Sequence, residues 1–212
     1  LVEILERDDE HTPPAHAAFY TEKLVYLPDC YQVNDDQLPI AAAQGRQLFG
    51  LSDDQLVLCC FNQPYKIDRR TFDAWLAILK HTPRAVLWLL GQNQSARENL
   101  GRAAAQAGIA SDRLKFAGAL RIDQHLARLK AADLALDPFI YNGGATTANA
   151  LWAGVPVLTL LGKHFVSRMS ASALMAAGKN VMAFQRTAPA HVVIGRGRGD
   201  VDLRSVSARL FA

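Results

Sequence analysis

The amino-acid sequence predicts an α/β protein built around an open parallel sheet. Four short apolar runs alternate with helical patterns, and a polar or glycine-rich segment follows each run. Such alternation is typical of right-handed βαβ units, which build a Rossmann-like sheet. Ligands bind such sheets at the carboxyl ends of the strands. A nucleotide-type site is therefore expected in the loops 61–66, 91–94, 117–121 and 137–144.

The central segment, residues 53–178, carries this pattern and is expected to be the nucleotide-binding lobe. Its first strand, 56–61, precedes a helix that Asp68 or Thr71 opens and whose apolar side chains recur every three or four residues. Further strands are predicted at 85–90, 113–116, 134–136 and 157–161. Further helices are predicted at 96–107, 123–131 and 167–177, and one more starts near residue 146.

The segment 133–159 has the order strand, Gly/Thr loop, helix N-terminus, strand. Gly143 and Gly144 close the loop, and Thr146 or Thr147 is predicted to cap the helix that follows. A helix N-terminus offers unpaired N–H groups and a partial positive charge to an anion, and glycines let the backbone approach it closely. The order therefore indicates a cradle for a diphosphate, although an ordinary capped helix explains the spacing equally well.

The two ends of the chain differ from this central segment. Residues 1–52 form no complete domain, and they contain a candidate strand at 22–27 and a possible short helix at 41–48. Residues 179–212 carry the run GRGRG, so most of this tail is expected to be poorly ordered or loosely attached. A basic Gly/Arg tail can bind RNA, but one short run is weak evidence for that function.

Composition disfavours several classes of function. The net charge of +3 is too small, and the basic residues are too scattered, to indicate a nucleic-acid partner. No apolar run reaches the roughly 20 residues of a membrane span, and the acidic start LVEILERDDE is unlike a signal peptide. Cys30, Cys59 and Cys60 lack a disulfide or zinc spacing, and the latter two are expected to be buried thiols. A cytoplasmic protein is predicted.

Several motifs together resemble those of a known family. The carboxy-terminal lobe of the protein O-GlcNAc transferase family is similar to FNQPYKID (61–68), LKHTPRAVLWLL (79–90), YNGGATTANALWAGVPVLT (141–159) and SRMSASAL (167–174). That family includes TPR-linked bacterial homologues and the SPINDLY-type plant enzymes. YLPDCYQVND (26–35) resembles the segment that precedes this lobe in bacterial members. The resemblance covers about residues 18–178.

The resemblance implies one lobe of a GT-B glycosyltransferase that inverts the anomeric centre and needs no metal or other cofactor. Family members transfer GlcNAc from UDP-GlcNAc, or fucose from GDP-fucose in the SPINDLY branch, to Ser or Thr hydroxyls of proteins. The implied partners are a UDP-sugar, an acceptor protein, a first lobe and TPR repeats, although the sequence shows no 34-residue period. Residues 1–52 then become the lead-in from a missing N-terminal lobe.

Carried over residue by residue, the likeness implies a site that is centred on one lysine. Lys66 would stabilise the charge that builds up as the glycosidic bond breaks, since a metal-free enzyme must neutralise the leaving diphosphate with its own groups. His125 and Arg128 match residues that the family packs near the uracil and the phosphates. From their sequence context alone, Lys66, His125 and Arg128 would be ordinary surface residues. The implied nucleotide-sugar ligands are Gln63, Lys66, His125, Arg128, Gly143, Gly144, Thr146, Thr147 and Asn149.

Four positions depart from the family pattern. Gly144 stands where His or Thr is common and Ala145 where threonine is usual, while Asn149 replaces the acid that grips the ribose hydroxyls and Ile122 replaces a basic or polar residue. Two alternatives therefore stay open. One is a catalytically dead remnant that still binds a nucleotide sugar, and the other is a different GT-B enzyme of nucleotide-sugar metabolism, such as an epimerase. Neither a dinucleotide-binding glycine motif nor a P-loop is present.

Overall fold

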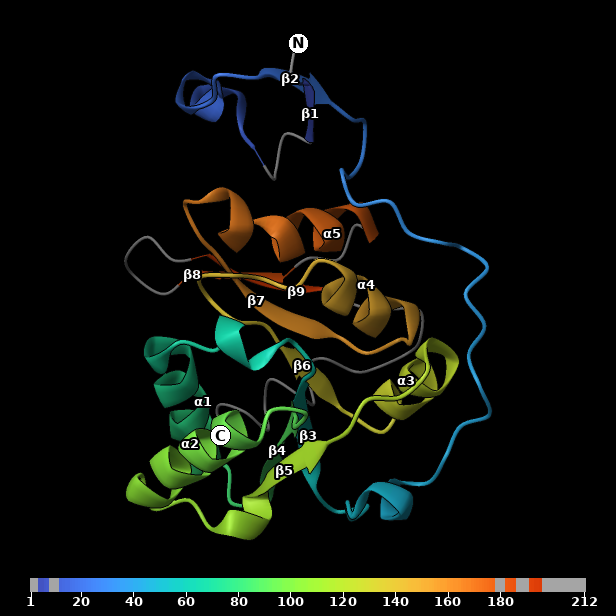
Figure 1. Ribbon diagram of the computed structural model, residues 1–212, viewed down its shortest axis with the longest axis vertical. Helices are drawn as coiled ribbons and strands as arrows, with labels where there is room; N and C mark the ends of the chain where they lie inside the picture. The colour runs from blue at the N-terminus through green and yellow to red at the C-terminus, as the bar shows by residue number, and fades with distance from the viewer. Residues whose placement is uncertain (1–3, 8–11, 178–181, 186–190, 196–212) are drawn as a thin grey trace.

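One open sheet forms the centre of the molecule. The computed structural model describes residues 4–7, 12–177, 182–185 and 191–195. Within these residues the strand order of the sheet is β5-β4-β3-β6-β7-β9-β8 (Figure 1). The parallel strands are β5 (Leu114–Ala117), β4 (Ala85–Leu90), β3 (Leu56–Cys60), β6 (Leu134–Leu136) and β7 (Val157–Leu161). The predicted α/β fold with a parallel sheet is confirmed, and each predicted strand lies within one residue of its observed bounds.

The apolar runs form strands because the sheet is covered on both faces. In β3, Leu56, Leu58 and Cys60 belong to one core cluster, and Val57 and Cys59 belong to the cluster on the other face. Both thiols are free and buried, as the sequence predicts, and burial raises the pKa of Cys60 to about 12. They are therefore packing residues rather than nucleophiles.

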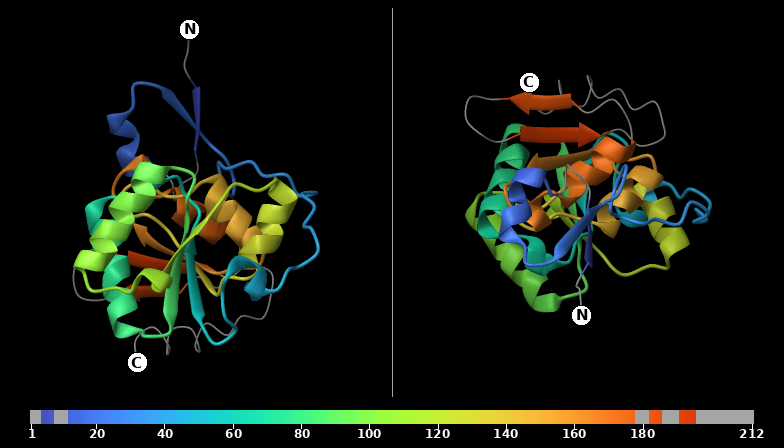
Figure 2. Two further views of the ribbon diagram at one scale, coloured as in Figure 1. Left: turned by 60° about the horizontal axis from the view of Figure 1, so that its bottom comes forward. Right: turned by 90° about the horizontal axis from the view of Figure 1, so that it is seen from above.

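The helices lie on both faces of the sheet (Figure 2). The described α-helices are α1 (Arg69–His81), α2 (Gln94–Gln106), α3 (Ile122–Leu129), α4 (Ala145–Trp152) and α5 (Met169–Ala177). Residues of α1 and α2 pack against one side of β3, and residues of α3, α4 and α5 pack against the other. Asp68 caps α1 as predicted, because its carboxylate accepts hydrogen bonds from the N–H groups of Arg70 and Thr71.

The N-terminal segment includes a strap, residues 27–49, that runs along the outside of this lobe (Figure 1). It starts from a small parallel pair, β1 (Ile4–Arg7) and β2 (Lys23–Tyr26), which is separate from the main sheet. The strap is tied to α4 by a hydrogen bond from Trp152 Nε1 to the carbonyl of Leu38. The short helix expected at 41–48 is wrong for most of its length, since only a 3₁₀-helix, Arg46–Phe49, forms there. Residues 41–45 form no regular element.

Two strands lie in the carboxy-terminal segment. β9 (His191–Gly195) pairs antiparallel with β7, and β8 (Met182–Gln185) pairs antiparallel with β9. For most of residues 179–212 the sequence predicts little order. Apart from these two strands, that segment lies outside the described residues, so the prediction stays untested there. No helix of the described part is long and apolar enough to cross a membrane.

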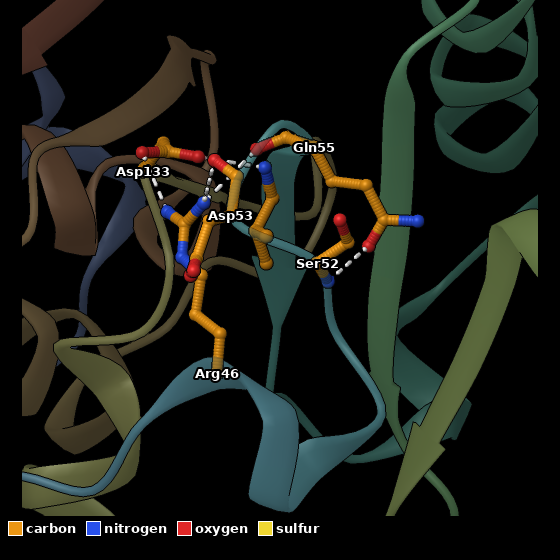
Figure 3. A network of polar contacts seen from close by, with 6 residues as sticks. Arg46, Ser52, Asp53, Gln55 and Asp133 are labelled. Atoms are coloured by element: carbon orange, nitrogen blue, oxygen red, sulfur yellow. Dashed lines mark hydrogen bonds and ion pairs between the residues drawn. The ribbon is translucent and has the colours of Figure 1, made fainter.

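A cluster of polar contacts, here called the clasp, holds the strap at the amino-terminal ends of β3 and β6 (Figure 3). The predicted site lies at the opposite, carboxyl ends of these strands. Arg46 Nη2 pairs with Asp133 Oδ1 at 2.8 Å, and its Nη1 donates to the carbonyl of Gln55 at 3.0 Å. The other carboxylate oxygen of Asp133 accepts from the N–H of Val57 at 2.7 Å. One carboxylate therefore fixes both the 3₁₀-helix of the strap and the start of β3.

Replacing Asp133 by Ala should lower the free energy of unfolding by about 1–3 kcal/mol, because it leaves Arg46 Nη2 and the Val57 N–H without their acceptor. Urea unfolding followed by circular dichroism would measure the loss. The control is Arg69→Ala, which removes an exposed ion pair with Asp73 within α1 and should cost about 0.5 kcal/mol or less. Equal losses in the two variants would contradict the clasp.

Candidate functional site

The candidate site lies at the switch point of the sheet, where the chain stops adding strands on one side and starts adding them on the other. From β3, the chain adds β4 and β5 on one side and then crosses to add β6 and β7 on the other side. The loops that leave the carboxyl ends of β3 and β6 therefore lie at the switch point of the sheet, which is where ligands bind in open α/β sheets. These loops are 61–66, which ends in a 3₁₀-helix at Pro64–Lys66, and 137–144, which leads into α4.

Lys66 bridges the two loops. Its Nζ donates a hydrogen bond to the carbonyl oxygen of Asn142 at 2.9 Å and lies 4.0 Å from the centroid of the Tyr141 ring. Burial lowers the pKa of this half-buried lysine, while the negative charge of Asp137 acts in the opposite direction. Lys66 thus contacts the residue that directly precedes Gly143.

The loop after β6 is held by buried side chains. Asp137 is 2 % exposed; its Oδ1 accepts from the N–H of Gly143 at 2.7 Å and its Oδ2 accepts from the Thr159 hydroxyl at 2.6 Å. Burial raises the pKa of Asp137 to about 6, against these hydrogen bonds and the charge of Lys66. Ser170 Oγ donates to the carbonyl of Gly143 at 2.9 Å. The backbone of the loop is therefore fixed before any ligand arrives.

The N-terminus of α4 differs from the prediction. The helix starts at Ala145, Gly144 is its N-cap residue, and no side chain caps it within the described structure. Thr147 is buried instead, and its hydroxyl pairs with Ser170 Oγ at 2.7 Å. The prediction that Thr146 or Thr147 caps this helix is therefore wrong. As at the start of any α-helix, the first-turn N–H groups of α4 have no intrahelical partners.

Both glycines of the loop sit in crowded positions. A Cβ at Gly143 would lie 2.7 Å from Thr147 Oγ1 and 3.1 Å from the Thr147 backbone nitrogen. A Cβ at Gly144 would lie 2.9 Å from Met169 Cε and 3.1 Å from Gln32 Oε1. Gly143 is the stricter requirement, because its neighbours are a helix backbone and a hydrogen-bonded hydroxyl that have no room to move.

His125 and Arg128 lie together on α3, and they are not the surface residues that their sequence context alone indicates. Arg128 is 3 % exposed; it donates to the carbonyl of Gly118 at 2.6 Å and its guanidinium lies 4.4 Å from the Phe61 ring centroid. Its Nη2 is 2.7 Å from His125 Nδ1. Burial and the neighbouring guanidinium lower the pKa of His125 to about 4, so this imidazole is neutral at pH 7. A cavity of about 290 Å³ borders Arg128, Trp88 and the loop after β5.

The remaining predicted residues are more dispersed. Gln63 is exposed at the start of the 3₁₀-helix that ends in Lys66, and Thr146 is partly buried in the first turn of α4. Asn149 lines a groove of about 520 Å³ that α4 and α5 form with strap residues such as Gln32 and Asp35. The structure thus brings Lys66, Gly143 and Thr147 together through shared partners, pairs His125 with Arg128, and sets Asn149 against the strap.

The sequence predictions missed the residues that hold the loop: Asp137, Thr159 and Ser170. A signal for Asp137 exists, because it directly follows the apolar strand β6 and precedes the glycine pair. Thr159 and Ser170 carried no signal, since their partners lie 22 and 27 residues away in the chain. Within the described residues, no group of three or more His, Cys, Asp or Glu side chains is arranged to hold a metal ion.

Comparison with known families decides which family this site belongs to. Residues 37–212 match the domain described as Glycosyl transferase family 41. The chain belongs to glycosyl transferase family 41. The sequence motifs place the end of the resemblance near residue 178, whereas the family match continues to residue 212.

Two curated relatives are about a third identical to this chain over the residues that align with it. The probable UDP-N-acetylglucosamine–peptide N-acetylglucosaminyltransferase SEC of Arabidopsis thaliana is 35% identical over 183 residues, which are 84% of this chain and 19% of that protein. The UDP-N-acetylglucosamine–peptide N-acetylglucosaminyltransferase of Caenorhabditis elegans is 35% identical over 133 residues, 63% of this chain and 12% of that protein. The chain therefore spans less than a fifth of these relatives.

Solved structures confirm the lobe and its architecture. A variant of the O-GlcNAc transferase of Thermobaculum terrenum superposes with a TM-score of 0.71 at 33% identity, and the match covers 82% of this chain and 33% of that one. Sucrose-phosphate synthase of Thermosynechococcus elongatus superposes with a TM-score of 0.54 at 20% identity and covers 73% of this chain and 39% of its own. The second likeness shows the fold alone, and together the two support the predicted GT-B lobe.

Gly143→Ala should disturb the loop without unfolding the sheet. Because the new Cβ would press on Thr147 Oγ1 and on the Thr147 backbone nitrogen, we expect a loss of about 1–3 kcal/mol in the free energy of unfolding. Gly101→Ala is the matched control: nothing lies within 4 Å of its Cβ position inside α2, so it should stabilise by about 0.5–1 kcal/mol. Urea unfolding measures both, and a neutral Gly143→Ala would contradict the crowding.

His125 should make stability depend on pH. Its pKa falls from about 6.5 in the unfolded chain to about 4 in the fold, so the unfolded state binds the extra proton between these values. The resulting stability is present above about pH 6.5 and is lost as the pH falls. We expect His125→Gln to remove about 1–2 kcal/mol of the difference in unfolding free energy between pH 7 and pH 5. The raised pKa of Asp137 acts with the opposite sign in both proteins and cancels in this comparison. An unchanged pH dependence in the variant would contradict the neutral, half-buried imidazole.

Proposed function

We propose that this chain is the donor-binding half of an inverting protein O-GlcNAc transferase, which takes UDP-GlcNAc and glycosylates Ser or Thr hydroxyls of proteins. The observation that carries this proposal is the contact of Lys66 with the loop that precedes α4, across the switch point of the sheet. Membership of glycosyl transferase family 41 and the likeness to a bacterial O-GlcNAc transferase support it.

In this proposal Lys66 and α4 receive the diphosphate of the donor. As the glycosidic bond breaks, negative charge builds up on the leaving diphosphate, and a preorganised ammonium and helix N-terminus stabilise it without a metal ion. An ammonium has three N–H donors, and one of them is used by the Asn142 carbonyl. With the Tyr141 ring also against Nζ, at least one donor remains for a phosphate oxygen. Gln63, Gly144, Thr146 and Thr147 complete the cradle in this proposal.

The base and the ribose are assigned by the same reasoning. Arg128 and Trp88 line the cavity of about 290 Å³ beside the loop after β5, and His125 and Phe61 pack against Arg128, so we assign the uracil to this cavity. Asn149 faces the groove beside the strap and would bond a ribose hydroxyl without charge assistance. Each of these roles supports a UDP-sugar as the ligand.

The complete activity requires partners beyond this chain. We propose that a first GT-B lobe closes over the donor, that TPR repeats and that lobe present the acceptor protein, and that the reaction takes place in the cytoplasm without a metal. The match covers a third of the Thermobaculum terrenum chain, so two thirds of that chain lie outside the match.

One observation favours a second candidate, a remnant that binds nucleotide sugars without transferring them. Gly144 and Ala145 present no hydroxyl or imidazole at the start of α4, and Asn149 has no charge. Incubating the full-length gene product with labelled UDP-GlcNAc and an acceptor peptide separates the two candidates. Transfer of label would eliminate the remnant.

Lys66→Ala should weaken UDP binding to the chain by about tenfold to a hundredfold, because a charge-assisted hydrogen bond to phosphate is worth about 1.5–3 kcal/mol. Isothermal titration calorimetry measures this affinity. Lys80→Ala, at the exposed end of α1, is the control for loss of one positive charge and should leave the affinity unchanged. Absence of UDP binding by the unaltered chain at millimolar nucleotide would contradict the proposed function.

A further inference from the structure

The peptide group between Asn142 and Gly143 is held at both of its polar atoms. Its carbonyl oxygen accepts from Lys66 Nζ at 2.9 Å, and its N–H donates to Asp137 Oδ1 at 2.7 Å. An ammonium group and a carboxylate therefore act on opposite ends of one peptide unit. Lys66 is half-buried and Asp137 is buried. Exclusion of water strengthens each contact relative to the same contact at the surface.

Asp137 is enclosed by partners from several elements. The Gly143 N–H and the Thr159 hydroxyl of β7 occupy its two oxygens, Lys66 supplies the positive charge that acts on it, and Cys60 of β3 is the neighbouring titratable group. A buried carboxylate is tolerated only when hydrogen bonds and a counter-charge compensate its lost hydration. With an exposure of 2 % and both oxygens engaged, Asp137 does not contact a ligand itself.

We propose that Asp137 is a positioning residue of the diphosphate site. Its carboxylate fixes the orientation of the Asn142–Gly143 peptide, which turns the carbonyl toward Lys66, and its charge is the counter-charge that keeps the Lys66 ammonium in place. This inference rests on the proposed role of Lys66 in binding the diphosphate. It extends that role by naming a group, distant from the ligand, on which the lysine depends.

The charges of the two residues are coupled. Burial lowers the pKa of Lys66, and the negative charge of Asp137 opposes that decrease. Without the carboxylate, the pKa of Lys66 should therefore fall further, and the neutral amine should appear at a lower pH. The hydrogen bond to Asn142 and the attraction for a diphosphate both weaken when the ammonium loses its proton.

The coupling can be measured without any nucleotide. We would follow the pH titration of the Lys66 side chain by the NMR signal of its Cε, assigned by its absence in Lys66→Arg. In Asp137→Asn the amide oxygen can accept from Gly143 and the amide nitrogen can donate to Thr159, so the geometry is kept while the charge is removed. We expect the Lys66 midpoint to move to lower pH in this variant.

Thr159→Val is the matched control for this titration. It removes a hydrogen bond to the same carboxylate but leaves the carboxylate ionised at the alkaline pH where Lys66 titrates. The Lys66 midpoint should therefore match that of the unaltered chain. An unchanged midpoint in Asp137→Asn, or equal shifts in the two variants, would overturn the role of Asp137 as counter-charge.

Binding of UDP-GlcNAc tests the positional part of the inference. This probe is preferred to UDP because the terminal phosphate of UDP gains a proton near pH 6. Asp137→Ala removes both the acceptor and the charge, so we expect the affinity to fall by about tenfold or more at pH 7. Asp137→Asn should bind more tightly than Asp137→Ala at pH 7 and lose more affinity than the unaltered chain between pH 7 and pH 9.

The two levels of the proposal fail in distinguishable ways. If the unaltered chain binds no UDP-GlcNAc, the proposed function is overturned, and the Lys66 titration alone decides whether the two charges are coupled. If the unaltered chain binds and Asp137→Ala, folded by its thermal melt, binds equally well, Asp137 is not a positioning residue. If Asp137→Ala does not fold, Asp137→Asn and Thr159→Val still decide the matter through the titration.

Discussion

The site depends on one peptide group that is held between two opposite charges. Lys66 comes from the loop after β3 and Asp137 from the end of β6, and the Asn142–Gly143 peptide lies between them. The arrangement requires that β3 and β6 are parallel neighbours, because only then do both loops leave the same end of the strands. It also requires glycine at position 143, where the space for a Cβ is taken by Thr147. The topology of the sheet therefore determines which charges can meet.

The rigidity of the sheet explains why this contact can be maintained. β3 is buried along its whole length between two core clusters, so the point at which its loop departs is fixed by packing on both faces. At the amino-terminal end of β3, the clasp of Arg46 and Asp133 fixes where the strand begins. The loop after β6 is then held by side chains of β7 and α5. A preorganised site costs little reorganisation when the ligand arrives, which is the condition for electrostatic stabilisation of a leaving group.

Much of the fold could be predicted from the sequence, because its determinants are local. Apolar runs that are buried on both faces predict the strands, and Asp68 predicts the start of α1 by capping it. The errors arise where distant residues decide. Thr147 has the chemistry of a cap, but Ser170, 23 residues away, takes its hydroxyl. His125 and Arg128 have the composition of a surface helix, yet Phe61 and Trp88 cover them. Asp137 acts through Thr159 and Gly143, and no short motif records that combination.

A nearly compensated pair of charges suits a site that has to release its product. A lone ammonium would bind a diphosphate strongly both before and after the reaction, and such uniform binding does not accelerate the chemical step. Because the charges of Asp137 and Lys66 offset each other, the free site carries little net charge, while the Lys66 ammonium still has donors beyond the one that the Asn142 carbonyl uses. Short hydrogen bonds from those donors gain most when charge accumulates on the leaving oxygen, since charge-assisted bonds are about twice as strong as neutral ones. In the proposed reaction, the same pairing that keeps the lysine in place would favour the transition state over the bound donor.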